Sequence, residues 1–136
     1  MAKLDWAIAP ELRGTLSLSA DASVSARYET LFIKATNLLA PTVKPKPIAV
    51  FFVRDVLKIN LTAQEKIAEY WRDMIVYNLA RMDLHHDERE IMVILLEELV
   101  HAYYDSPDKE YVGKIVAQVY QQVRFDAIKM QYVPKT

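Results

Sequence analysis

Two carboxylates and one imidazole interrupt an otherwise apolar stretch, IMVILLEELVHAYY (residues 91–104). At about 100° per residue, a helix places Glu97 and His101 one turn apart on one face, with Tyr104 further along that face and Glu98 about a quarter-turn away. Burying a carboxylate costs several kcal/mol unless it is neutralised, paired or bound to a metal. Carboxylate oxygen and imidazole nitrogen both bind divalent ions such as zinc and manganese. The stretch therefore makes Glu97, Glu98 and His101 candidates for a metal site, with Tyr104 as a residue that could line a pocket.

The same spacing also has an ordinary structural interpretation. Glu97 and His101 are separated as an i,i+4 pair on a helix surface, which stabilises a helix by about 0.2–0.5 kcal/mol. Glu98 could then face solvent, with the apolar residues covering the other sides of the helix. No serine lies in the sequence context of a hydrolase nucleophile, so a serine hydrolase has no support.

A second cluster, His85-His86-Asp87-Glu88, precedes this helix. Histidines beside acids can bind metal, and His86 is the residue that could reach the metal as an additional ligand. Neighbouring residues in a helix point about 100° apart, however, and this cluster falls in a short link between two expected helices. A surface loop is the favoured interpretation.

Hydrophobic periodicity predicts the elements that position these residues. Strands are expected over 12–19, 48–53 and 57–61, the last two as a hairpin, and helices over 21–40, 62–81, 87–104 and 106–127. Capping signals begin all four of these helices, at Asp21, Thr62, Asp87 and Ser106, and Pro41 is expected to end the first. The tail, 131–136, is expected to fray. The fold class is therefore α+β, a small β-hairpin or sheet packed by about four helices.

Composition limits the possible functions. At 136 residues the chain is expected to form a single domain, 1–136. The 17 basic residues are offset by 18 acidic ones, which argues against nucleic-acid binding. The absence of cysteine excludes disulfides and thiol chemistry, and two glycines leave no glycine-rich phosphate loop. No apolar run approaches a membrane span, so we expect a cytoplasmic protein that does not bind membranes.

The stretch ILLEELVHAYY resembles the helical H-E-x-x-H motif of zincin metallopeptidases, with the first histidine replaced. By this resemblance Glu97 and His101 would be metal ligands and Glu98 the catalytic general base. Peptidases of the ImmA/IrrE kind carry a third glutamate ligand in E-x-x-A-x-x-F-A, which is similar to residues 110–117, EYVGKIVA. Glu110 would then be the third ligand. SprT-like domains are a second family with a similar order of elements, and the resemblance spans about residues 22–120.

Two functions from different classes follow. The first is a divergent zincin-like metallopeptidase domain of the kind that phages or mobile elements encode, catalytically active or inactive, that holds zinc or manganese and acts on a peptide. The second is a non-catalytic binding or inhibitory domain that needs no cofactor and contacts a protein partner through its tyrosine-rich helices. Metal content separates the two.

Overall fold

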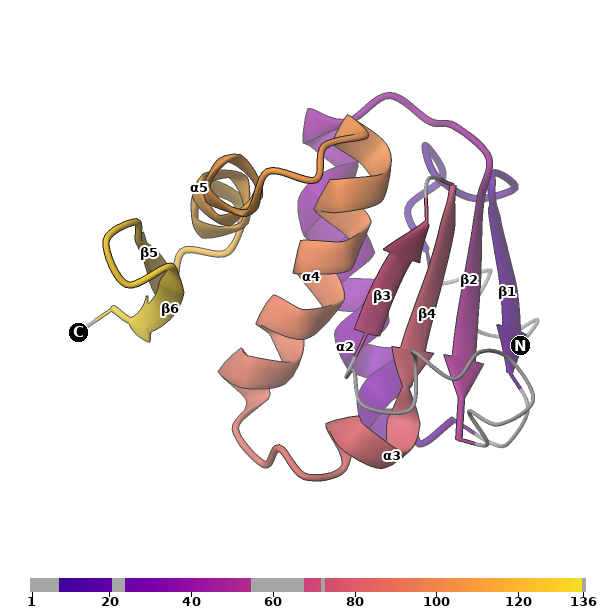
Figure 1. Cartoon of the computed structure of the whole chain (residues 1–136). Coiled ribbons are helices and arrows are strands. Elements are labelled where there is room, and N and C mark those ends of the chain that lie inside the picture. The colour runs from indigo at the N-terminus through magenta and orange to yellow at the C-terminus, as the bar shows by residue number, and fades with distance from the viewer. Residues whose placement is uncertain (1–7, 21–23, 55–67, 72, 136) are drawn as a thin grey trace.

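The computed structural model (Figure 1) describes residues 8–20, 24–54, 68–71 and 73–135. The chain has a mixed α+β fold, as its sequence predicts. In chain order the elements are β1 (Leu16–Ala20), α2 (Ala26–Leu39), the 3-10 turn η1 (Ala40–Thr42), β2 (Ile48–Val53), β3 (Ala68–Trp71), β4 (Met74–Asn78), α3 (Leu79–Met82), α4 (Glu88–Tyr104), α5 (Lys109–Val119), β5 (Val123–Asp126) and β6 (Gln131–Pro134). Within the described residues, no helix combines the length and apolar character needed to cross a membrane.

The larger sheet has four strands in the order β1-β2-β4-β3. β1, β2 and β4 run parallel, whereas β3 runs antiparallel to β4. Parallel neighbours require a long crossover connection, and α2 lies in the connection between β1 and β2. The register aligns Leu18, Val50 and Ile75 across three strands, so their side chains share one face of the sheet.

That face of the sheet is covered by α2 and α4, which lie side by side (Figure 1). Between the two layers, the Phe52 ring lies 5.3 Å from Phe32 of α2 and 5.4 Å from Tyr77 of β4, measured between ring centroids. The buried Tyr77 hydroxyl donates a hydrogen bond of 2.6 Å to the carbonyl of Leu95. Left without a partner, such a hydroxyl would cost about 1–3 kcal/mol, so this bond holds the middle of α4 against β4.

The first two elements begin later than their sequence patterns predict. The strand expected over 12–19 begins at residue 16, because Gly14 before it adopts a left-handed backbone with φ of 89°. The helix begins at residue 26, and its cap is Ser25. Asp21, the cap expected from the sequence, lies outside the described residues. The helix ends before Pro41, as predicted.

The predicted helix over 62–81 is wrong in the part of it that the structure describes. Residues 68–71 and 74–78 are strands, and of the described residues in this range only 79–81, the start of α3, are helical. β4 lies between β2 and β3, and its residues from Ile75 to Asn78 are buried one after another. Such a run shows no alternation, so its periodicity does not separate a strand buried on both faces from a buried helix.

The hairpin predicted from 48–53 and 57–61 is replaced by a different pairing. The first strand is confirmed as β2, but β1 and β4 occupy its two edges, and both run parallel to it. Residues 57–61 lie outside the described residues. The antiparallel pair that the larger sheet contains is β3 with β4, one step later in the chain.

The C-terminal part of the chain also differs from its prediction. A helix over 106–127 and a frayed tail over 131–136 are expected from the sequence, and the structure has a shorter helix and two strands. α5 ends at Val119, and β5 and β6 then form a two-stranded antiparallel hairpin. The hairpin packs directly on α5, because a Cβ atom at Gly113 would overlap the Phe125 ring. Residues 131–134, within the segment expected to fray, therefore form strand β6.

Candidate metal centre

Three potential metal ligands meet on α4. One ligand atom from each of Glu97, Glu98 and His101 lies within 4.8 Å of the others. All three residues are partly buried. The structure therefore brings together the three candidate residues that the sequence places on one helix.

α4 positions this group through ordinary helix signals. Asp87 caps the helix, its carboxylate accepting a hydrogen bond of 2.8 Å from the Arg89 amide. The helix ends at Tyr104 and is capped by Asp105, whose left-handed backbone has φ of 48°. Between these ends the apolar residues are buried against the rest of the core, among them Leu95, Leu96, Leu99 and Val100. The remaining strip of the helix, which carries the three polar groups, is left only partly covered.

The His101 ring is oriented by the link that leads into α5. Its Nδ1 lies 2.6 Å from the carbonyl oxygen of Ser106. A carbonyl can only accept, so Nδ1 carries the hydrogen and Nε2 of the neutral ring keeps its lone pair. Nε2 lies 4.0 Å from Glu97 Oε1, with side chains that are 13% and 22% exposed. A backbone carbonyl that holds the second ring nitrogen is the usual support of a histidine ligand.

Two phenol rings flank the carboxylates from different elements. Burial, followed by the negative charge of Glu98, raises the pKa of Tyr77 on β4. Burial, followed by interactions with Glu97 and then Glu98, raises the pKa of Tyr132 on β6. Oε2 of Glu98 and the Tyr132 hydroxyl are both buried atoms. The group thus lies between the sheet on one side and the C-terminal hairpin on the other.

Glu110, the third ligand implied by the resemblance, is not brought to this group. It lies in the first turn of α5, which Asp108 caps rather than Ser106. Its carboxylate is 48% exposed and lies 3.5 Å from Lys114 Nζ, an i,i+4 pair of the same helix. The group of mutually close ligand atoms contains Glu97, Glu98 and His101 without it.

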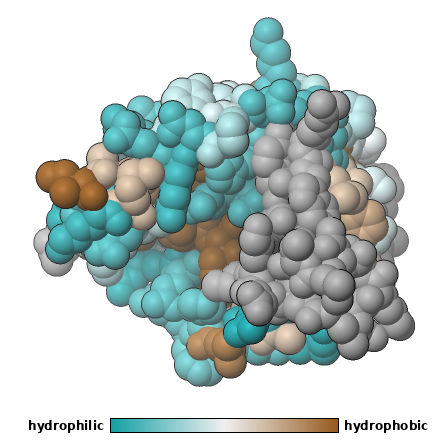
Figure 2. All heavy atoms as spheres, in the orientation of Figure 1, coloured by the Kyte–Doolittle hydropathy of each residue, from teal (hydrophilic) through white to brown (hydrophobic). Residues whose placement is uncertain are grey.

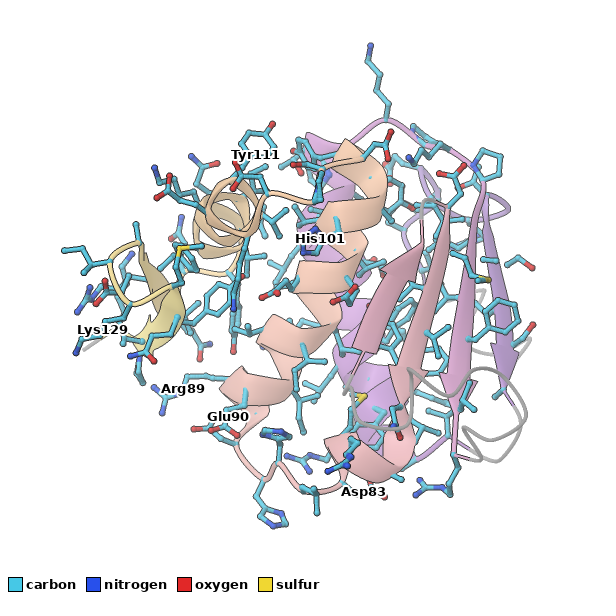
Figure 3. The ribbon with its side chains drawn as sticks, in the orientation of Figure 1. Asp83, Arg89, Glu90, His101, Tyr111 and Lys129 are labelled. Atoms are coloured by element: carbon cyan, nitrogen blue, oxygen red, sulfur yellow. The ribbon has the colours of Figure 1, made fainter. Side chains whose placement is uncertain are left out.

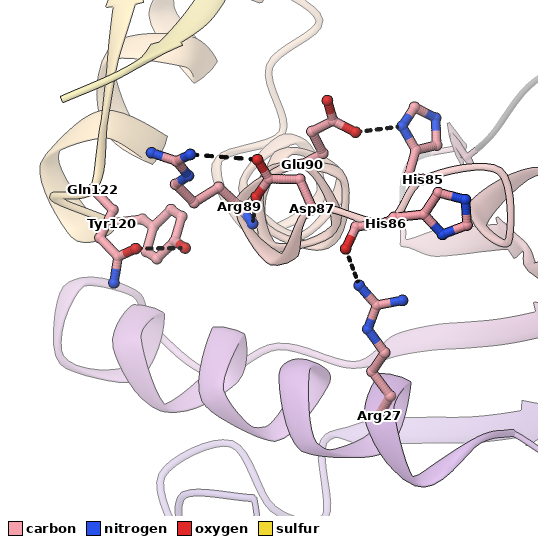
Figure 4. Close-up of polar contacts among 8 residues, drawn as sticks. All are labelled: Arg27, His85, His86, Asp87, Arg89, Glu90, Tyr120 and Gln122. Carbon is pink, nitrogen blue, oxygen red and sulfur yellow. Dashed lines mark hydrogen bonds and ion pairs between the residues drawn. The ribbon is translucent and has the colours of Figure 1, made fainter. Parts of the chain in front are cut away.

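His86 and Tyr104 also have other surroundings. His86 is exposed in the loop between α3 and α4, where its carbonyl accepts a bond of 2.7 Å from Arg27 (Figure 4). Figure 3 labels His101 well along α4 from that loop, on the side toward α5. The Tyr104 hydroxyl donates to the carbonyl of Thr42 at 3.2 Å. Its ring packs edge to face on Tyr111, 6.1 Å between centroids.

Sequence reasoning missed the contribution of the hairpin. Tyr132 and its neighbours line a groove of about 340 Å³ that also runs along the first half of α4. Figure 2 shows hydrophobic surface inside a hollow of this face of the molecule. A signal was present, since Phe125 and Tyr132 are aromatic residues near the chain end, a composition that favours strands over a frayed tail.

Comparison of the chain with known proteins finds no matching family model, no matching curated protein and no matching solved structure. The likeness to zincin peptidases therefore depends on the residues of α4 and α5 quoted above.

Proposed function

We propose that this protein is a divergent zincin-like domain that binds one divalent metal ion, zinc or manganese, through Glu97 and His101. The observation that supports this most strongly is the convergence of three ligand atoms within 4.8 Å on one partly buried helix face. The second support is the Nδ1 bond of His101 to the Ser106 carbonyl, which leaves Nε2 as a ligand atom on the side of Glu97.

The donor set fits such an ion. Imidazole nitrogen and carboxylate oxygen are common zinc ligands, and carboxylates also suit manganese. Two carboxylates side by side repel each other when both are ionised, and a bound cation offsets this repulsion. Partial burial adds to the advantage of a bound cation, because charge interactions strengthen as water is excluded.

Peptide hydrolysis is the reaction that this arrangement supports best. A bound divalent ion polarises a substrate carbonyl and lowers the pKa of water. Glu98 lies within the same group and supplies a carboxylate that can take up the proton of the attacking water. His101 is held in one tautomer by Ser106, so its role is binding rather than proton transfer.

Metal content tests the binding step. The protein, dialysed against zinc or manganese and then against metal-free buffer, should retain a stoichiometric amount of metal by elemental analysis. Glu97→Ala and His101→Ala should each lose it. His86→Ala and Glu110→Ala are matched controls and should retain it, because both residues lie outside the group. Retention of metal by the His101 variant would contradict the proposal.

Glu98→Gln separates binding from catalysis. The amide keeps the shape of the side chain but cannot accept a proton, so we expect metal to be retained and hydrolysis of a dye-labelled casein to fall about 10²–10⁴-fold. Equal casein turnover by this variant and the parent protein would remove the catalytic role of Glu98 while leaving the metal site intact.

A second candidate function, a non-catalytic binding domain, is favoured by one surface feature. Tyr111 is 48% exposed and its ring packs on Tyr104, so the two tyrosines form an aromatic pair at the junction of α4 and α5. Partly exposed tyrosines suit protein interfaces. A metal-free preparation whose stability does not respond to chelator, together with loss of a partner on Tyr111→Ala, would favour this function over the first.

A further inference from the structure

A groove separates the first half of α4 from the C-terminal hairpin. It measures about 340 Å³. Its apolar lining comes from α4, β5 and β6, and consists of Val93, Ile94, Val123, Tyr132, Val133 and Pro134. This volume is near the lower limit of ligand pockets, about 300–1,000 Å³, so the groove can hold one or two side chains but not a folded segment.

The charged residues of the groove lie at one end and pair with each other. His85 Nδ1 lies 2.8 Å from Glu90 Oε2, and Arg89 Nη2 lies 3.4 Å from Asp87 Oδ2 (Figure 4). Each acid of the groove therefore has a partner within the groove wall, and so does each base. A charged ligand would have to compete with these pairs, whereas an apolar side chain would displace water from the apolar lining. The charge distribution favours an uncharged, apolar occupant.

The groove approaches the candidate metal centre at Tyr132, although Glu97, Glu98 and His101 are not among its lining residues. The Tyr132 side chain lines the groove, while its buried hydroxyl interacts with Glu97 and Glu98. On α4, Val93 of the groove precedes Glu97 by one helical turn, about 6 Å along the axis at about 1.5 Å per residue. An extended peptide advances about 3.3–3.6 Å per residue, so this separation corresponds to about two residues.

We propose that the groove is a specificity subsite that binds an apolar side chain of a peptide, about two residues from the peptide bond presented to Glu97, Glu98 and His101. The proposal rests on the proposed function, because the metal group defines where the reacting bond lies. It assigns the C-terminal hairpin to substrate selection and gives Tyr132 a position between the selected side chain and the reacting group.

Val133→Asp is the variant that tests the subsite. Val133 lines the groove from β6 and is partly exposed, so the change places a charge in the groove without removing a buried core residue. Ile128→Asp is the matched control, since it makes the same kind of substitution in the same hairpin at a residue that is 96% exposed and outside the groove. Metal content and thermal unfolding are measured for both variants.

The probe is a set of eight-residue peptides of alanine and glycine, dye-labelled at the N-terminus, each carrying one leucine, lysine or aspartate at successive positions. The metal-loaded protein should cleave leucine peptides with a kcat/KM at least about ten-fold above that of the lysine and aspartate peptides, the discrimination expected of an apolar pocket. Val133→Asp should remove this preference while retaining metal, and Ile128→Asp should keep it. Fluorescence anisotropy in the presence of chelator should show the same preference as binding.

Two results would overturn the proposal, and they differ from failure of the metal site. An unchanged leucine preference in Val133→Asp would place selection elsewhere while leaving metal binding and hydrolysis intact. Equal binding of all three peptides by the parent protein, with or without metal, would show that the groove selects no apolar side chain. Loss of the metal site itself is read separately, from elemental analysis of the parent protein.

Discussion

Two polar clusters of this molecule differ in the groups that surround their acidic side chains. The first joins α2, the end of β2 and the end of α3, where Asp83 accepts a hydrogen bond of 2.5 Å from the Tyr28 hydroxyl and one of 2.7 Å from Arg54. The second is the group of Glu97, Glu98 and His101 on α4. Both contain acids, but the first holds a single acid between two donors, whereas the second places two acids and an imidazole side by side on one helix.

This difference distinguishes a structural cluster from a candidate binding cluster. Hydrogen bonds from Tyr28 and then from Arg54 lower the pKa of Asp83, so the carboxylate is stabilised by the fold itself. On α4 two carboxyl groups and a ring nitrogen, all of them ligand atoms for cations, lie close together. The first cluster is an acid held by hydrogen-bond donors, whereas the second is a set of ligand atom types suited to a divalent cation.

The largest expected effect is the response of stability to metal. Zinc or manganese at about 100 times its dissociation constant should raise the free energy of unfolding by about 2.7 kcal/mol, because the ion binds only the folded state. His101→Ala should abolish this increase, and Asp83→Ala should retain it. Denaturation curves with metal and with chelator measure both. A metal response that is lost in Asp83→Ala and kept in His101→Ala would contradict the assignment of the metal site to α4.

Asp83→Ala should have the next largest effect. Removing the carboxylate leaves the Tyr28 hydroxyl and Arg54 without this acceptor, and we expect a loss of about 1–2 kcal/mol, reduced from the buried range because the Asp83 side chain is 46% exposed. The loss should be the same with metal and with chelator. Asp73→Ala is the control, since the Asp73 side chain pairs with Lys46 at 3.0 Å but is 62% exposed and should contribute less than about 1 kcal/mol. Similar losses in the two variants would deny Asp83 its structural role.

The smallest expected effect is the change in the free energy of unfolding at acidic pH. Because the pKa of Asp83 is lowered from 3.8 in the folded state, its contribution is present above that value and is lost as pH falls through the lower folded value. Asp83→Asn should therefore cost stability at neutral pH and progressively less below about pH 4. Urea unfolding of both proteins across this range measures the difference. A difference that does not change with pH would mean that the hydrogen bonds do not depend on the charge of Asp83.

The elements that sequence patterns predicted well are those whose signals are local. Strand β2 is a continuous β-branched and aromatic run, and α4 begins at its capping residue Asp87, as expected. β4 was predicted as helix, because a strand paired on both edges and buried on both faces loses the alternation that identifies strands. The C-terminal hairpin was missed for a related reason, since its order comes from packing against α5 at Gly113.

The sequence by itself determined that Glu97, Glu98 and His101 share one helix and lie close together, because helical periodicity relates residues three and four apart through backbone geometry alone. Only the tertiary structure decided which groups from other elements join them. It leaves Glu110 paired with Lys114 on α5 and brings Tyr132 from the last strand beside the carboxylates. These placements depend on how α5 and the hairpin pack on α4, a sum of contacts between distant residues that no local spacing encodes.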